Sequence, residues 1–299
     1  MNIKWEDSVW FIDLDDTLID TANGSPPAAE GVYEYLSNHI HEDQARKIAD
    51  RFVEFFRASL KSHTTKVQPT KDDQSEWVAT YRDLQNKSSR LQTTIIRDTG
   101  HAKTWSREVW VKIAADELKI DLAPDIVMQA ADAYWNILAE EVELLDGAEE
   151  LVDDIIRHHR PAYIATASDG RLLMQEDGQF VYDPKHSEKM KRPRVEMMKQ
   201  RGLRFTSFSI GDPHDKPYVD FFEKIADVAR KDLGSIDYKN CIMVGDSYAS
   251  DLETPHKQLG FGLVALIDPV VDGIEIRDEN HIAAGSLNNL RTWFDSRQQ

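Results

Sequence analysis

The sequence contains very little cysteine and no long hydrophobic run. Cys241 is the only cysteine among 299 residues, so no intramolecular disulfide can form and no zinc site can be built on a cysteine framework. No stretch approaches the roughly 18 consecutive apolar residues of a transmembrane helix. The N-terminal residues include acids and lack the apolar segment of a signal peptide. These absences predict a protein of the reducing cytoplasm that does not enter a membrane.

The sequence also contains far fewer basic than acidic residues. Lys and Arg number 36 against 53 Asp and Glu, which gives a net charge of −17. Nucleic acids and anionic membranes attract positive surfaces, so this balance makes a nucleic-acid partner improbable and argues against a membrane partner. It does not exclude a small anionic substrate, because a metal ion and a few local cations can reverse the potential inside one cleft.

Short apolar runs alternate with amphipathic stretches over much of the chain. Runs of four to six residues, several rich in Val and Ile, are typical of strands buried on both faces of a parallel sheet. Helical periodicity over 147–159 and after Pro217 places helices between them. This alternation predicts an α/β fold with a Rossmann-like, doubly wound parallel sheet. The predicted strands are Val9–Ile12, Ala162–Ala165, Phe205–Ile210, Cys241–Val244 and Leu263–Ile267.

The interval between the first strand and the rest of the sheet has no convincing strand. It contains several amphipathic helical patterns and four of the seven Trp residues, enough for a core of its own. At about 150 residues per domain, the chain length suits two domains. We therefore predict an α/β core domain of residues 1–20 and 146–299, with an all-helical domain of residues 21–145 inserted into it. The predicted helices of the insert are 28–40, 43–60, 75–84, 106–118 and 124–139, and 61–73 is predicted to be a loop.

The segment Phe11–Leu18 places two carboxylates directly after the first strand. Asp13 and Asp15 are two residues apart, so in extended backbone their side chains lie on the same side. The carboxyl ends of strands are also where open α/β sheets bind ligands. Adjacent carboxylates repel each other unless a cation or a proton separates them. The pattern indicates a metal or acid–base site, although a polar turn after a strand would look the same.

A second acidic group follows the strand Cys241–Val244. Gly245 permits close backbone approach, and Asp246 and Asp251 follow it. Such carboxylates can supply the oxygen ligands of a hard cation such as Mg²⁺. A helix N-terminus capped by an acidic residue is the alternative interpretation.

Two weaker patterns occur at other predicted strand ends. The strand Ala162–Ala165 is followed by the hydroxyl residue Thr166, and Lys216 precedes the helix after Pro217. Each is common in proteins without a functional role. The four patterns are informative together, because each lies at the end of a predicted strand or in the loop that follows it.

Together the four motifs resemble those of the haloacid dehalogenase-like (HAD) hydrolase superfamily. The resemblance covers most of residues 8–20 and 147–267, and the helical insert resembles the family's type 1 cap in position and helical character. It implies that Asp13 attacks phosphorus to form an aspartyl-phosphate and that Asp15 acts as the acid and base. It further implies that Thr166 and Lys216 bind and neutralise the phosphoryl oxygens.

The resemblance also implies a magnesium cofactor. Its ligands would be Asp13, the backbone carbonyl of Asp15, and Asp246, while Asp251 would support the metal's waters or orient Lys216. Dehalogenases that resemble this chain lack a carboxylate at the position of Asp15, so phosphoryl transfer is favoured. We therefore predict a Mg²⁺-dependent phosphatase acting on a small phosphorylated metabolite.

Three departures from the family pattern bear on details. Asp16 stands where Gly is more frequent. Because Asn often follows the hydroxyl residue in the family but Ala167 follows it here, Ser168 is a second candidate for the phosphate contact. Pro255 falls within the helix expected after Asp251 and is predicted to shorten or kink it.

The segment 185–204 is unusually basic for such an acidic chain. It holds eight basic residues and two acidic ones, so it could steer an anionic substrate or bind nucleic acid, although a solvated helix face is the simpler interpretation. Just before it, Asp177-Gly178 predicts a small hairpin over 172–182. Two alternatives to a metabolite phosphatase stay open: a non-catalytic, phospho-ligand-binding or regulatory protein on the same fold, and a phosphatase of nucleic-acid ends. The basic residues are Lys185, Lys189, Lys191, Arg192, Arg194, Lys199, Arg201 and Arg204.

Overall fold

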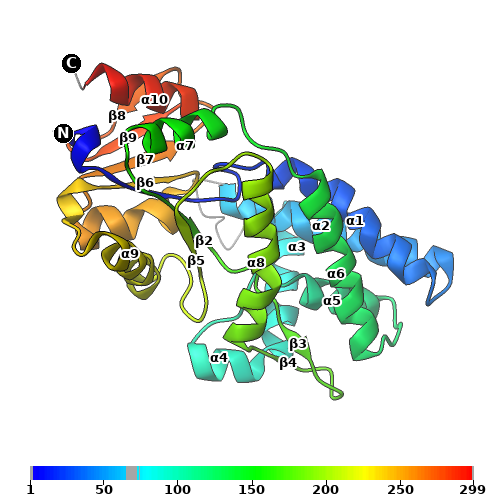
Figure 1. Ribbon diagram of the computed structural model, residues 1–299. Helices are drawn as coiled ribbons and strands as arrows, with labels where there is room; N and C mark the ends of the chain where they lie inside the picture. Colours follow the sequence, from blue (N-terminus) through cyan, green and yellow to red (C-terminus); the bar gives the residue numbers. More distant parts are fainter. Residues whose placement is uncertain (1–2, 65–72, 74, 298–299) are drawn as a thin grey trace. The chain divides into compact units, whose positions relative to one another are not determined.

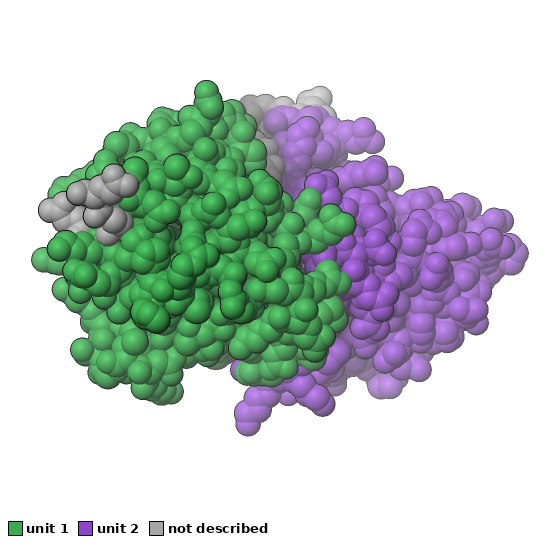
Figure 2. Space-filling view, turned by 45° about the horizontal axis from the view of Figure 1, so that its top comes forward, with its two compact units in different colours: residues 1–20, 143–168, 191–299 green, residues 21–142, 169–190 purple. Residues whose placement is uncertain are grey.

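A computed structural model describes residues 3–64, 73 and 75–297 of the chain. The chain forms two compact units, coloured separately in Figure 2. The first comprises residues 1–20, 143–168 and 191–299, and the second comprises residues 21–142 and 169–190. No helix among the described residues is both long enough and apolar enough to cross a membrane.

The first unit is built on a seven-stranded sheet in the order β5-β2-β1-β6-β7-β9-β8. All neighbouring strands are parallel except β8, which pairs antiparallel with β9 at one edge. β1 is fully buried and lies between β2 and β6, with Ile12 in register with Ile164 and Val244. The strands are β1 (Val9–Ile12), β2 (Ala162–Thr166), β5 (Ser207–Ile210), β6 (Cys241–Gly245), β7 (Leu263–Ile267), β8 (Ile274–Ile276) and β9 (His281–Ala284).

Helices cover both faces of this sheet because successive residues of a strand point to opposite sides. Trp10 packs edge-on against Phe294 of α10 (Leu287–Ser296). Its neighbour Phe11 belongs to a cluster with Phe221 and Phe222 of α9 (Val219–Leu233). In Figure 1, α10 and α7 (Ala148–Arg157) lie on one side of the sheet and α9 on the other. The predicted doubly wound α/β architecture is confirmed.

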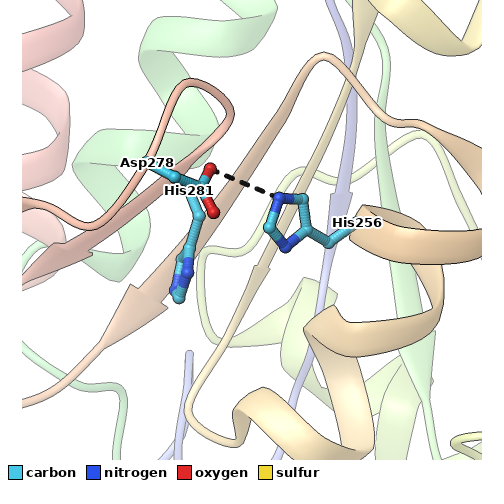
Figure 3. Close-up of side chains that lie close together, drawn as sticks. All are labelled: His256, Asp278 and His281. Atoms are coloured by element: carbon cyan, nitrogen blue, oxygen red, sulfur yellow. Dashed lines mark ion pairs between the residues drawn. The ribbon is translucent and has the colours of Figure 1, made fainter.

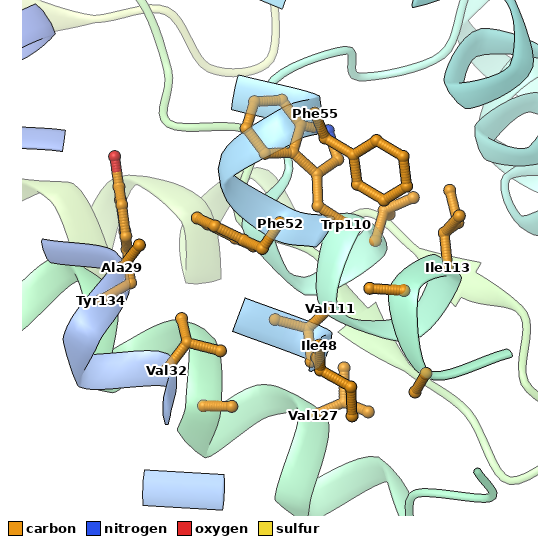
Figure 4. Packing of buried hydrophobic residues seen from close by; sticks show 14 of the residues in the cluster. Ala29, Val32, Ile48, Phe52, Phe55, Trp110, Val111, Ile113, Val127 and Tyr134 are labelled. Atoms are coloured by element: carbon orange, nitrogen blue, oxygen red, sulfur yellow. The ribbon is translucent and has the colours of Figure 1, made fainter. Parts of the chain in front are cut away.

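The second unit is a helical domain with its own core. Its helices bury aromatic and aliphatic side chains against one another, and Phe52 contacts both Trp110 and Tyr134 (Figure 4). Pro124 begins its last long helix, where the missing N–H costs nothing. The helices are α1 (Thr21–Ser37), α2 (Glu42–Thr64), α3 (Glu76–Leu91), α4 (Thr93–Thr99), α5 (Arg107–Glu117) and α6 (Pro124–Glu141).

The division of the chain differs from the sequence-based domain bounds in two places. Residues 143–145, predicted to belong to the helical insert, group with the α/β unit. Residues 169–190, predicted to belong to the α/β domain, group with the helical unit. They contain the hairpin of β3 (Leu173–Met174) and β4 (Phe180–Val181), which the Asp-Gly turn predicted. Arg171 explains the grouping, because its buried guanidinium pairs with Glu108 and Asp132 of the helical unit. Leu172 and Phe180 are buried in the same core.

Other differences concern elements with weak local patterns. The edge strands β8 and β9 and the helices α4 and α10 were not predicted. The predicted loop 61–73 is helical to Thr64, and residues 65–72 lie outside the described part of the chain. The chain around Asp251 forms the π-helical turn η3 (Tyr248–Leu252), and Pro255 begins a second one, η4 (Pro255–Leu259). The helix α8 (Pro184–Gln200) carries most of the basic segment.

The buried Arg171–Glu108 pair yields a stability prediction for the helical unit. Arg171→Met leaves the fully buried Glu108 carboxylate without this partner, so the free energy of unfolding should fall by about 3–5 kcal/mol. Urea denaturation of the whole chain measures the change. Adding Glu108→Gln should recover part of the loss. Arg97→Ala, which removes an exposed pair with Asp98, is the control and should cost less than about 0.5 kcal/mol. An equal loss of stability in Arg171→Met and Arg97→Ala would contradict this explanation.

Candidate active site

The loop after β1 brings the first carboxylate to the carboxyl edge of the sheet. Asp13 is buried, and its backbone N–H donates to the carbonyl of Val244 on β6 at 2.9 Å. The hydroxyl of Thr17 donates to Asp13 Oδ2 at 3.1 Å. The carboxylate is therefore fixed from both sides, by the neighbouring strand and by its own loop.

Two further carboxylates reach the same place from the loop after β6. Asp13, Asp246 and Asp251 each offer an oxygen, and these atoms lie within 4.8 Å of one another. Gly245 makes the approach possible, because a Cβ there would lie 2.5 Å from Asp251. The backbone N–H of Ser247 donates to Asp251 Oδ2 at 3.0 Å. Glycine is thus required by packing at this strand end.

Lys216 supplies a positive charge within this carboxylate cluster. Its side chain is only 4% exposed, and its ammonium pairs with Asp13 Oδ1 and with Asp251 Oδ1, the latter at 2.8 Å. The residue comes from the loop after β5, the edge strand of the same half of the sheet. Three carboxylates thus face one ammonium, so the fully ionised cluster has two uncompensated negative charges.

Asp15 points to a different set of partners in the first unit. Its Oδ1 accepts from Arg194 at 2.7 Å, and its Oδ2 pairs with Lys191 at 3.1 Å. The hydroxyl of Thr166, at the end of β2, lies 3.4 Å from the same Oδ2. Both cations come from α8 and are almost fully buried. Asp13 and Asp15 therefore have different ion-pair and hydrogen-bond partners although they are two residues apart, while the charge of Asp15 still contributes to the raised pKa of Asp13.

The pKa values of the clustered acids reflect burial and mutual repulsion. Desolvation raises the pKa of Asp13 to about 7; Lys216 opposes this rise, while the charge of Asp251 adds to it. Desolvation, followed by the charges of Asp251 and Asp13, also raises the pKa of Asp246 well above its usual range. Burial alone would lower the pKa of Lys216, but the two carboxylates outweigh it and raise that pKa above its ordinary value. The carboxylates therefore have too little positive charge near them, whereas the ammonium of Lys216 has two carboxylates beside it.

This charge balance fits a hard divalent cation. Carboxylate oxygens are the ligands that Mg²⁺ prefers, and two positive charges would neutralise the excess in the cluster. The donors lie close together; Asp13 and Asp251 are buried and accept hydrogen bonds, and Asp246 is half-buried. The residues present therefore fit the metal that the sequence motifs imply.

The structure brings the predicted site residues together at one edge of the sheet. Asp13, Asp246, Asp251 and Lys216 form one cluster, and Thr166 lies beside Asp15. Ser168, the second candidate for a phosphate contact, is engaged elsewhere. Its hydroxyl and its backbone N–H donate to Asp215 Oδ2 at 2.8 and 3.0 Å, where that carboxylate also accepts from the N–H of Lys216 at 2.9 Å. Through Asp215, Ser168 therefore helps to order the loop that carries Lys216.

Sequence reasoning missed the roles of Lys191 and Arg194. The solvated-face interpretation of the basic segment holds for most of its residues, including the exposed Lys185 and Lys199. It is wrong for Lys191 and Arg194, which point inward to Asp15. Their spacing of three residues, which places side chains on one helix face, was the available signal. No local sequence pattern predicts which face of α8 is buried.

Comparison with known proteins agrees with this architecture. A family model described as haloacid dehalogenase-like hydrolase matches residues 9–256, and the chain belongs to this family of hydrolases. A search of curated proteins finds no match to the sequence.

Solved structures resemble the chain over nearly its whole length. A HAD phosphatase from Thermococcus onnurineus is 13% identical, with 96% of this chain and 97% of that chain covered at a TM-score of 0.51. A 2-haloacid dehalogenase from Pseudomonas syringae is 15% identical, with coverages of 98% and 100% and a TM-score of 0.51. A protein from Bacillus subtilis described as a HAD-hydrolase, bound to magnesium, is 14% identical, with coverages of 97% and 99% and a TM-score of 0.50. The shared fold therefore occurs in proteins named for different reactions.

The raised pKa of Asp13 predicts how stability depends on pH. Between an ordinary pKa of 3.8 and the folded value of about 7, the folded protein holds a proton that the unfolded chain has released. Stability should therefore fall as the pH rises through this window, by up to about 1.4 kcal/mol per pH unit for this group. Chelator-treated protein denatured with urea at several pH values between 5 and 7 gives the slope.

Asp13→Asn removes this titration and should flatten the slope, and Mg²⁺ should stabilise the wild-type protein more at pH 8 than at pH 6. The pKa of Asp246 is also raised, so some slope is expected to persist in the variant. An identical slope in the wild type and the variant would exclude Asp13 as its source.

Proposed function

We propose that the protein is a Mg²⁺-dependent phosphohydrolase that cleaves a small phosphorylated metabolite through an aspartyl-phosphate intermediate. The observation that carries the proposal is the separation of two carboxylates with different surroundings on one loop. Asp13 belongs to the cluster of Asp246, Asp251 and Lys216, while Asp15 stands outside it. A nucleophile and an acid–base group need this division of surroundings.

In the first step, a carboxylate oxygen of Asp13 attacks phosphorus and the ester P–O bond breaks. Asp15 gives its proton to the leaving oxygen, so the product is an alcohol and the phosphoryl group stays on Asp13. Thr17 fixes the orientation of the nucleophile through its hydrogen bond, and Lys216 neutralises charge on the phosphoryl oxygens. Positioning and charge stabilisation do most of the work in phosphoryl transfer.

In the second step, water attacks the aspartyl-phosphate. Asp15, now ionised, takes a proton from the water, and the acyl-phosphate P–O bond breaks to release inorganic phosphate and the Asp13 carboxylate. Thr166 lies at hydrogen-bonding distance from Asp15 and is placed at the end of β2, where it can donate to the phosphoryl group. The site returns to its starting protonation state.

Mg²⁺ would be held by the carboxylates of Asp13 and Asp246 and by the backbone carbonyl of Asp15, with Asp251 orienting its waters and Lys216. When bound, it supplies positive charge to the phosphoryl oxygens. It would also keep Asp13 ionised at a pH where burial alone favours the protonated form.

Phosphoryl transfer is favoured over dehalogenation by Asp15. A leaving halide needs no proton, whereas a leaving alkoxide does, and Asp15 is the carboxyl group that can provide one. The helical unit follows the first motif directly, which agrees with a type 1 cap that provides substrate specificity. With no membrane-crossing helix among the described residues and a single cysteine, we infer a cytoplasmic enzyme.

Lys191 and Arg194 extend the proposal to phosphate binding. In the structure these cations bind the Asp15 carboxylate, and an ion-paired carboxylate is a poor proton donor. A phosphate dianion is a stronger partner for a guanidinium than a single carboxylate. We infer that the substrate's phosphoryl group draws the two cations from Asp15, which releases this residue for acid catalysis.

Two alternatives are less well supported. A non-catalytic phospho-ligand-binding or regulatory protein would not need the complete set of Asp13, Asp15 and Lys216. A phosphatase of nucleic-acid ends was suggested by the basic segment, but two of its cations are buried against Asp15 rather than displayed. Activity confined to phosphorylated oligonucleotides, with a steep salt dependence, would favour that reading.

Loss of the nucleophile is the primary test. The wild-type protein should hydrolyse p-nitrophenyl phosphate with Mg²⁺ and lose this activity in excess chelator. Asp13→Asn should reduce kcat by at least about 1,000-fold, since the covalent route is closed. A phosphate-ester panel and 2-chloropropionate run in parallel distinguish the two reactions. Halide release without phosphate release would overturn the proposal.

The cations of α8 provide a second test with a matched control. Arg194→Ala removes a charge-assisted hydrogen bond, so inorganic phosphate should inhibit about 10- to 100-fold more weakly and KM should rise similarly. Arg192→Ala on the same helix removes an exposed guanidinium 3.8 Å from Glu196 and should change neither value. Equal effects of the two substitutions would mean that Arg194 does not bind phosphate.

A further inference from the structure

A second group of metal-ligating side chains lies in the first unit, away from the carboxylate cluster. His256 belongs to η4, Asp278 to the turn between β8 and β9, and His281 to the first position of β9. Each offers one ligand atom, and these atoms lie within 4.8 Å of one another. Figure 3 shows the three side chains converging from two separate segments of the chain.

His256 is fixed by contacts on both sides of its ring. The side chain is only 7% exposed, and Nε2 lies 3.3 Å from Asp278 Oδ1, as the dashed line in Figure 3 marks. The other nitrogen, Nδ1, lies 3.0 Å from the hydroxyl of Tyr248. A hydrogen bond from Nδ1–H to this hydroxyl would leave the lone pair on Nε2, directed toward Asp278. Metal-binding histidines are oriented by partners of this kind.

His281 lies beside this pair. Its ring stacks on Tyr248 with centroids 4.8 Å apart and lies 5.5 Å from the ring of His256. Its Nε2 is buried and has no hydrogen-bond partner among the described residues.

A simple ion pair accounts for only part of this arrangement. His256 and Asp278 could pair without His281, and a buried imidazole nitrogen with no partner is costly. Lys257 also approaches Asp278, at 3.8 Å, and Arg277 pairs with Glu275 instead. Two imidazoles and one carboxylate form the donor set that suits a transition-metal ion better than Mg²⁺.

We propose that His256, Asp278 and His281 bind a divalent transition-metal ion of the zinc type, with water as a fourth ligand. Tetrahedral ligands bound to zinc at about 2.0–2.2 Å lie roughly 3.3–3.6 Å apart. The 3.3 Å between His256 Nε2 and Asp278 Oδ1 already matches this spacing. The bound ion would join η4 to the edge hairpin of β8 and β9.

Two of the three cluster residues lie outside the segment that matches the family model. The family match ends at residue 256, so Asp278 and His281 lie beyond it. The site is also separable from the proposed magnesium site by chemistry, since its ligands include two nitrogens. The inference therefore does not depend on the proposed phosphatase activity.

Calorimetric titration of the full chain with Zn²⁺ tests the proposal. The protein is treated with chelator, and excess Mg²⁺ is present throughout to occupy the carboxylate cluster. One Zn²⁺ should bind per chain. His281→Gln and Asp278→Asn should each weaken binding more than about 100-fold, beyond the 10- to 100-fold expected when Tyr248→Phe removes only the orienting hydroxyl. Glu279→Gln, a carboxylate in the same turn but outside the cluster, should leave the affinity unchanged.

Two readouts separate metal binding from a loss of folding. Each variant is first unfolded thermally in chelator, where it should match the wild type within a few degrees. With Zn²⁺, the wild type should gain thermal stability and His281→Gln should not. Zn²⁺ that binds equally well to His281→Gln, or that fails to bind the wild type, would overturn the proposal. Because neither readout measures hydrolysis, the result does not depend on whether the protein is a phosphatase.

Discussion

The structure of the first unit depends on the burial of negative charge at one edge of its sheet. Asp13, Asp246 and Asp251 are brought together by adjacent strands, and the ammonium of Lys216 pairs with two of them, Asp13 and Asp251. Burial of unpaired charge is expensive, so such an arrangement persists only with compensation from hydrogen bonds and cations. The shifted pKa values of Asp13 and Asp246 record this cost. The same charge imbalance makes the edge suited to a divalent cation and to a phosphoryl group.

The fold also separates two carboxylates that are neighbours in the sequence. Asp13 faces the cluster, while Asp15 faces Lys191 and Arg194. Different environments give two similar groups different chemistry, which is how a single loop can supply both a nucleophile and an acid–base group. Since structures with the same fold are named both as phosphatases and as dehalogenases, these local surroundings are a better guide to reaction type than the fold.

The far edge of the sheet has a different character. There the chain continues beyond the residues that the family model matches and forms an antiparallel hairpin, and two histidines with one carboxylate meet beside it. This cluster offers two nitrogen donors and one carboxylate, whereas the cluster at the other site offers carboxylates only. The two sites would therefore bind different metals. An ion at this edge would tie a short, exposed strand to the body of the unit.

The sequence by itself determined the strand core, the order of the acidic motifs and the helical insert, because these features depend on local periodicity and on the rule that parallel strands end at the same edge. The resemblance to the family implied that Asp13, Asp246 and Lys216 belong to one site. Only the tertiary structure decided that Arg194 meets Asp15 across 179 positions and that residues 169–190 join the helical unit. Packing between distant segments selects which face of a helix turns inward, and no local pattern encodes that choice.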